Sequence, residues 1–216
     1  HFRIISKNDL TAVQMLMTFK QISEINHNPY DAFVCCILTH GQLKGELAGA
    51  DMRFIKMQQI LNLFTSDKCQ SLAGKPKVFF IQACEGRSRQ LVVNSRVVRD
   101  DPPETGPAIE LIHRSPTHAD FLLGYCTVSG CNAFRHTTEG SWYVTALVET
   151  LEKHRTEEIM SILQAVNEIM RMRRSSEDIE DEDYSQIAAP VMSLSKNLYF
   201  ARLSTKETRF GHTETF

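Results

Sequence analysis

Two residues capable of nucleophilic chemistry each follow an apolar run of strand length. The run KVFFIQ (residues 77–82) leads to Cys84, and the run FVCCIL (residues 33–38) leads to His40 and Gly41. A free thiol is only a few per cent ionised at neutral pH, so a nucleophilic cysteine needs a base such as histidine. The two positions therefore predict a dyad of His40 and Cys84, provided that their strands are neighbours.

The segment between the two runs indicates how these strands are arranged. It contains a predicted helix, Ile55–Phe64, and a helix between two buried strands is a βαβ unit, whose strands are parallel. Ligands bind at the carboxyl ends of parallel strands, where His40 and Cys84 would lie. Taken singly, each residue is more often structural, and their coincidence favours catalysis. Without a side chain, Gly41 allows its N–H to approach an oxyanion together with the N–H of Cys84.

The remaining chain predicts further elements around this unit. Thr11 and Gln14 form a capping box that opens a helix to about Ile25, with Val13, Leu16 and Ile22 inward. The other expected elements are a strand at Phe2–Ser6, a hairpin at residues 41–49, a strand at Asp120–Thr127, helices at 141–154 and 156–172, and closing strands at 191–194 and 198–203.

Composition limits the class of protein. The chain has 216 residues and a net charge of −2, which favours one domain and argues against nucleic acid or an acidic membrane surface as a partner. Its apolar runs are far shorter than the roughly 18 residues of a membrane span, and His1–Asp9 lacks the apolar core of a signal peptide. The six cysteines show no metal-ligand spacing, which favours reduced thiols and a cytoplasmic location.

The motif around the dyad resembles a known family. His40 and Gly41 followed by QACEG (residues 82–86) resemble the caspase signature, in which Q-A-C-x-G lies about 50 residues after the catalytic histidine. Further stretches stand in family order: SKNDLT (6–11), SLAGKPK (71–77), ADFL (119–122), GSW (140–142) and LYF (198–200). The resemblance extends to about Leu203. Glu85 departs from the Arg, Gln or Gly that is usual in the family, and Asn132 from an aromatic residue.

The resemblance implies a fold and an activity. The expected fold class is α/β, a caspase-like three-layer sandwich with a mostly parallel sheet and helices on both faces. Residues 1–86 would resemble the large subunit, 87–118 the intersubunit linker and 119–204 the small subunit, followed by a tail at 205–216. The protein would be a zymogen of a cysteine endopeptidase that hydrolyses peptide bonds after Asp in apoptosis or related signalling. Its catalytic residues would be His40 and Cys84, with Gly41 and Cys84 forming the oxyanion hole.

The resemblance also assigns the substrate pocket. Gln82 and Arg135 match two of the three family residues that enclose the substrate aspartate, and the second arginine belongs to a segment upstream of His1. A guanidinium binds a carboxylate with two parallel hydrogen bonds, as this role requires. Backbone at Ala133 and Arg135 would pair with the substrate as an added strand, while Phe134 would line the next subsite and Trp142 the fourth.

Partners follow from the same resemblance. They would be protein substrates cleaved after Asp, a second copy or another caspase in a dimer, and inhibitor-of-apoptosis or adaptor proteins. The alternative is a caspase-like regulator with little or no activity that pairs with an active caspase. Pro190 lies in the strand expected at the dimer interface, and proline donates no N–H there, so a weak homodimer is predicted. A pocket for Arg or Lys, as in metacaspases, is disfavoured because it needs carboxylates.

Overall fold

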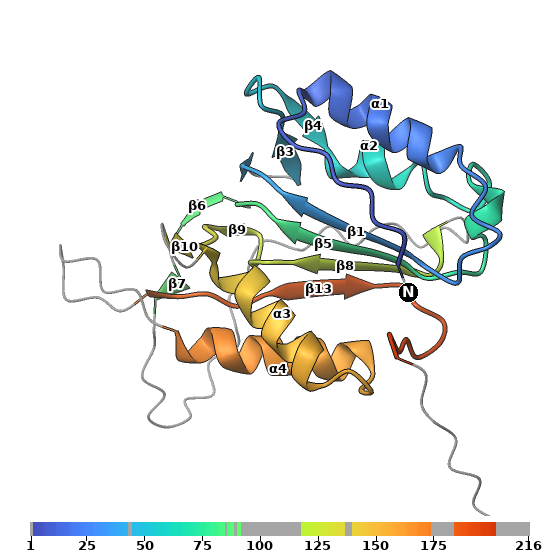
Figure 1. Cartoon of the computed structure of the whole chain (residues 1–216). Helices are drawn as coiled ribbons and strands as arrows, with labels where there is room; N and C mark the ends of the chain where they lie inside the picture. The colour runs from blue at the N-terminus through green and yellow to red at the C-terminus, as the bar shows by residue number, and fades with distance from the viewer. Residues whose placement is uncertain are drawn as a thin grey trace, which may run out of the picture.

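The computed structural model describes residues 2–42, 45–84, 86–88, 90–91, 118–136, 140–173 and 184–201 (Figure 1). Most of the predicted linker 87–118, the acidic run at 177–183 and the predicted tail 205–216 lie outside these ranges. Within the predicted linker, two short stretches form strands: the end of β6 (Gly86–Ser88) and β7 (Gln90–Leu91).

A four-stranded sheet forms the centre of the molecule, in the order β1-β5-β8-β13. Its strands are β1 (Phe33–Leu38), β5 (Lys77–Gln82), β8 (Phe121–Tyr125) and β13 (Ala189–Met192). The first three are parallel, and β13 runs antiparallel to β8. In Figure 1 the arrows of β1, β5 and β8 accordingly point to the same side. The predicted βαβ unit and mostly parallel sheet are confirmed.

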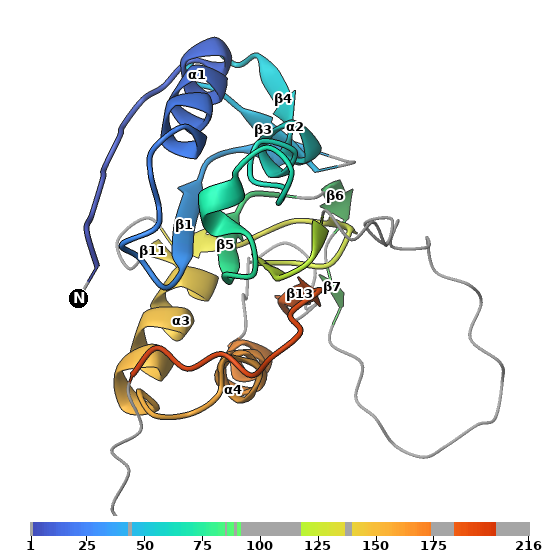
Figure 2. The same cartoon turned by 90° about the vertical axis from the view of Figure 1, so that its right-hand side faces the viewer.

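Helices cover both faces of this sheet, as Figures 1 and 2 show. On one side lie α1 (Ala12–Ser23) and α2 (Met57–Leu61), and on the other α3 (Trp142–Lys153) and α4 (Ile159–Met172). Successive side chains of a strand point to opposite faces, so β5 serves both layers. Phe79 and Ile81 pack in the cluster beside α1 and α2, and Val78 and Phe80 in the cluster beside α3 and α4. The α/β sandwich predicted from the sequence is therefore present.

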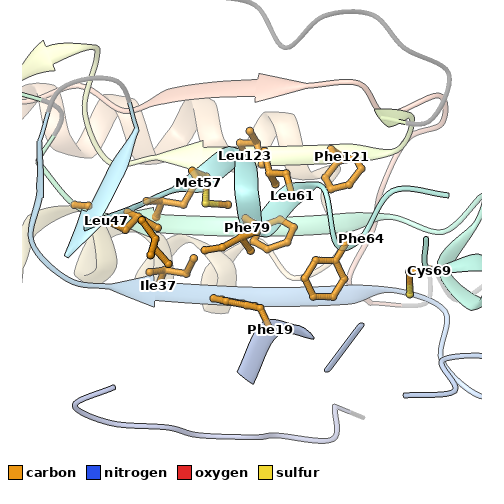
Figure 3. Close-up of a cluster of buried hydrophobic side chains, with 14 of the residues drawn as sticks. Phe19, Ile37, Leu47, Met57, Leu61, Phe64, Cys69, Phe79, Phe121 and Leu123 are labelled. Carbon is orange, nitrogen blue, oxygen red and sulfur yellow. The ribbon is translucent and has the colours of Figure 1, made fainter. Parts of the chain in front are cut away.

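Aromatic rings dominate the cluster under α1 and α2 (Figure 3). The ring of Phe64 stacks on that of Phe33 with centroids 4.6 Å apart, and Phe79 meets Phe64 edge to face at 5.8 Å. Phe79 and Phe64 are fully buried. This packing holds the central residues of β5 in place, and β5 is the strand that leads to Cys84.

The helix α1 confirms one local prediction and corrects another. Thr11 accepts the N–H of Gln14, whose side chain accepts the N–H of Thr11 at 2.9 Å, which is the predicted capping box. Val13, however, is 57% exposed, so its predicted inward position is wrong. Ala12 and Phe19 are the buried residues instead, because the apolar stripe is centred on Phe19.

The smaller elements extend the predicted hairpin. The strands β2 (Gly41–Gln42), β3 (Glu46–Ala48) and β4 (Phe54–Lys56) form an antiparallel sheet. The helix predicted at 55–64 is shorter in the structure, because Ile55 belongs to β4 and the α-helix α2 covers only Met57–Leu61. The others are η1 (Gln70–Leu72), β9 (Gly130–Cys131), β10 (Arg135–His136), β11 (Gly140–Ser141) and β12 (Tyr184–Ser185). They pair as β6 with β9, β7 with β12 and β10 with β11.

Two predicted strands are absent from the described residues. Phe2–Ser6 forms no ladder, and the described part of the predicted strand 198–203, residues 198–201, contributes only an isolated bridge between Tyr199 and Glu158. Phe2 contacts Phe200 edge to face at 6.1 Å, and both line a cavity of about 390 Å³ together with Val34, Cys36 and Leu38 of β1. A strand needs a second segment to share backbone hydrogen bonds, and no described segment pairs with Phe2–Ser6.

The orientation of Pro190 in β13 follows from the ladder. Ser193 donates its N–H to the carbonyl of Phe121 at 2.7 Å, so this residue faces β8. Backbone groups alternate between the two sides of a strand, and Val191 therefore also faces β8 while Pro190 and Met192 face the outer edge. The missing N–H of Pro190 costs no bond within the chain and falls on the open edge of the sheet.

None of the helices among the described residues is both long and apolar enough to cross a membrane.

Candidate active site

His40 and Cys84 lie at corresponding positions past the ends of adjacent strands. Leu38 pairs with Gln82 in the parallel ladder, and the N–H of Thr39 donates to the carbonyl of Gln82 at 3.0 Å. His40 and Cys84 each follow two residues after this last pair. The carbonyl of His40 accepts the N–H of Ala48 at 2.8 Å, which fixes the turn into β2.

Gly41 packs directly against the backbone that carries the thiol. A Cβ atom added to Gly41 would overlap the carbonyl oxygen of Cys84 and would lie 2.9 Å from the Cβ of Ala83. No side chain larger than hydrogen fits this position without displacing one of the two segments. The structure therefore brings Gly41 and Cys84 together, as the proposed oxyanion hole requires.

The thiol of Cys84 is half-buried beside a second segment. Its Sγ lies 3.9 Å from the carbonyl oxygen of Ala133. Behind it, the thiol of Cys126 donates to the carbonyl of Ala83 at 3.2 Å, and the N–H of Cys126 donates to the carbonyl of Ile81 at 3.0 Å. Segments far apart in the sequence thus fix the backbone on both sides of Cys84.

Ser141 contacts the side chain of Gln82 and lies opposite the backbone of Arg135. The hydroxyl of Ser141 lies 2.5 Å from Oε1 of Gln82, and the same hydroxyl accepts the N–H of Val144 at the start of α3. In the pairing of β10 with β11, Arg135 lies opposite Ser141. The backbone of Arg135 and the side chain of Gln82 therefore converge on one residue.

The segment 133–135, called the substrate strand below, has a defined orientation. Phe134 donates its N–H to Oε1 of Gln186 at 2.7 Å and accepts the N–H of Trp142 at 3.4 Å. Both bonds lie on the inner side, so the alternation of an extended chain directs the backbone groups of Ala133 and Arg135 the other way. The carbonyl of Ala133 accordingly faces Cys84. This outer side can pair with an extended peptide.

Phe134 and Trp142 form one aromatic surface next to this strand. Their ring centroids are 5.1 Å apart with an interplanar angle of 30°, and both residues are half-buried. Phe134 was predicted to line the second subsite and Trp142 the fourth. Their contact means that a movement of either ring changes the environment of the other.

Three residues of the site were not identified from the sequence: Ser141, Cys126 and Gln186. Ser141 had a local signal, since serine is a common N-cap and Ser141 is the first residue of the predicted helix 141–154. Gln186 had none, because its two hydrogen-bond partners, Phe134 and Cys126, are 52 and 60 residues away in the sequence. Its role is visible only in the folded chain.

Comparisons with known proteins agree with this geometry. A family model described as "Caspase domain" matches residues 1–199. The chain is 37% identical to caspase-8 of Rattus norvegicus, over 93% of this chain and 42% of that protein. It is 34% identical to caspase-3 of Xenopus laevis, over 92% of this chain and 67% of the relative.

Caspase-1 of Spodoptera frugiperda is 38% identical over 75% of this chain and 52% of its own length. The chain thus spans less than half the length of the caspase-8 sequence it matches. The match covers the strands that carry His40 and Cys84 as well as the substrate strand. This chain belongs to the caspase domain family.

Proposed function

We propose that the protein is a cysteine endopeptidase that hydrolyses peptide bonds after Asp. One observation carries the proposal: His40 and Cys84 end adjacent parallel strands in register, and Gly41 packs on the backbone of Cys84. Family membership supports a protease of this type. The biological setting proposed is apoptosis or related signalling in the cytoplasm.

The proposed reaction proceeds through an acyl-thioenzyme. His40 takes the proton of the Cys84 thiol, and the thiolate attacks the backbone carbonyl carbon of the substrate aspartate. The N–H groups of Gly41 and Cys84 stabilise the negative charge on the carbonyl oxygen. The carbon–nitrogen bond breaks, and His40 gives its proton to the leaving amine. A water molecule, deprotonated by His40, then releases the peptide acid and restores the thiol.

The proposed specificity depends on Gln82 and Arg135. The hydroxyl of Ser141 donates a hydrogen bond to Oε1 of Gln82. The Nε2 group of Gln82, a hydrogen-bond donor, therefore points away from Ser141. An amide donor and a guanidinium suit the aspartate carboxylate. A pocket of buried donors rejects substrates without the acceptor by a factor of about 10⁴, because its donors would stay unpaired.

Assembly is part of the proposal. The open edge of β13 would meet a second copy or another caspase, and inhibitor-of-apoptosis or adaptor proteins would be further partners. The division into residues 1–86, a linker at 87–118 and 119–204 is proposed on the same basis. No cofactor takes part in the proposed reaction.

The test compares two thiols in peptide hydrolysis. Cys84→Ala should abolish cleavage of an Asp tetrapeptide, and His40→Ala should lower kcat/KM by at least about 10³-fold, since the thiol loses its base. Cys131→Ala, which removes a half-buried thiol on β9, is the matched control and should retain activity. An aspartyl covalent inhibitor should label Cys84 alone.

Undiminished cleavage by Cys84→Ala would refute the proposal. A parent chain that cleaves nothing but changes the rate of an active caspase when mixed with it would favour the alternative, a regulator that acts by pairing.

A further inference from the structure

Gln186 joins two separate segments of the active site. It lies between β12 and β13, and only 1% of its surface is exposed. Its Oε1 accepts the N–H of Phe134 at 2.7 Å, and its Nε2 donates to the carbonyl of Cys126 at 2.5 Å. One buried side chain thus connects the substrate strand to the end of β8.

The position of Gln186 is itself well determined. Two residues later, Ala188 donates its N–H to Oδ1 of Asn167 at 2.8 Å and accepts Nδ2 of the same side chain at 3.1 Å. Asn167 belongs to α4, whose apolar face is buried against the sheet. The backbone that carries Gln186 is therefore fixed to a packed helix.

The other partner of Gln186 leads to the reactive thiol. Cys126 is bonded to β5 through the carbonyls of Ile81 and Ala83, and Ala83 directly precedes Cys84. A chain of short contacts thus runs from Phe134 through Gln186 and Cys126 to the residue next to Cys84. It sets the distance between the substrate strand and the thiol.

We infer that Gln186 is a positioning residue for substrate binding: by holding Phe134 on the inner side, it directs the backbone of Ala133 and Arg135 toward the substrate. The inference rests on the proposed function. Without this acceptor, the N–H of the half-buried Phe134 would lose its hydrogen-bond partner, and the segment would rotate to satisfy it. The peptide backbone would then lose its pairing partners even though His40 and Cys84 remain in place.

A purely structural role for Gln186 predicts something else, a loss of stability with no change at the substrate strand. The chain offers a reporter that separates the two. Trp142 is its single tryptophan, and its ring lies 5.1 Å from that of Phe134. Tryptophan fluorescence therefore reports the position of Phe134, whether or not the protein cleaves peptides.

The experiment compares Gln186→Met with the control Phe19→Leu, which removes core packing under α1 on the other face of the sheet and leaves both bonds of Gln186 and its anchor Asn167 in place. For Gln186→Met we expect KM for an Asp tetrapeptide to rise about 10-fold or more with a smaller change in kcat. Acrylamide quenching of Trp142 should increase, and alkylation of Cys84 by iodoacetamide should keep its rate. Phe19→Leu should lose stability without changing KM or the quenching.

Gln186→Glu is the conservative variant. It keeps an acceptor for Phe134 and loses the donor to Cys126, so its KM and quenching should lie between those of the parent and Gln186→Met. If Gln186→Met does not fold, the KM and quenching of Gln186→Glu test the inference in its place.

Parent values of KM and quenching in a folded Gln186→Met or Gln186→Glu protein would overturn the inference. So would the same changes in Phe19→Leu. If the parent cleaves no peptide, the proposed function fails, and the quenching comparison alone decides whether Gln186 positions Phe134.

Discussion

Replacing Gly41 by alanine tests the contact that brings the two halves of the proposed dyad together. The added Cβ would overlap the carbonyl oxygen of Cys84 and would lie 2.9 Å from the Cβ of Ala83, whereas ordinary contacts begin at 3.4 Å. The atoms that it meets belong to the backbone and to a short side chain, so no flexible group can give way. The segment 83–84 must move.

The expected effect has two parts. Overpacking of this kind lowers the free energy of unfolding by about 1–3 kcal/mol. A displacement of about 1 Å at the reacting atoms lowers the rate about 100-fold, and here the displaced segment carries both the thiol and an N–H of the proposed oxyanion hole. We therefore expect kcat/KM for an Asp tetrapeptide to fall about 100-fold, as measured beside urea unfolding of the same protein.

Gly74→Ala is the matched control. Gly74 lies in the turn before β5, at the opposite end of the strand from Cys84, and an added Cβ would meet no atom within 4 Å. Its φ of +70° makes alanine unfavourable by about 1–2 kcal/mol, so the stability loss is similar in size. This variant should keep its kcat/KM. Parent activity in Gly41→Ala, or an equal loss in Gly74→Ala, would refute the reasoning.

Four further outcomes are expected. Arg135→Ala should abolish cleavage after Asp while the fold persists, at a cost of about 3–5 kcal/mol for an unpaired carboxylate; equal parent rates on Asp and Ala peptides would contradict this. Pro190→Val should tighten self-association in sedimentation, because it returns an N–H to the outer edge of β13; unchanged association would count against it. Burial, followed by the neighbouring Cys36, raises the pKa of the Cys35 thiol from 9.0 to about 12. As pH rises from 9 toward 12, the unfolded chain loses this proton before the folded chain does, so the free energy of unfolding should fall. The fall should be smaller in Cys35→Ala, and identical pH profiles of the two proteins would exclude this effect. Self-cleavage at Asp100 or Asp101 should be slow, because an acid follows the first and Pro102 the second; rapid autolysis by mass spectrometry would contradict it.

The strands that carry the proposed dyad were predictable because their signals are local. The runs at 33–38 and 77–82 are apolar and of strand length, and both form strands with the predicted parallel pairing. The capping box of Thr11 is likewise a pattern of neighbouring residues, and it is present. Where the prediction failed, the deciding partner was distant. Phe2–Ser6 has a strand-like sequence, but a strand needs a second segment to bond with, and no described segment pairs with these residues.

The sequence alone determined the residue types of the site, the order of the main elements and the family. It did so because periodicity, capping and motif spacing depend on residues close together in the chain. Only the tertiary structure decided that Ser141 orients Gln82, that Pro190 faces the open edge, and that Gln186 holds Phe134. Those contacts join segments tens of residues apart, and their formation depends on how the sheet and helices pack around the strand that ends at Cys84.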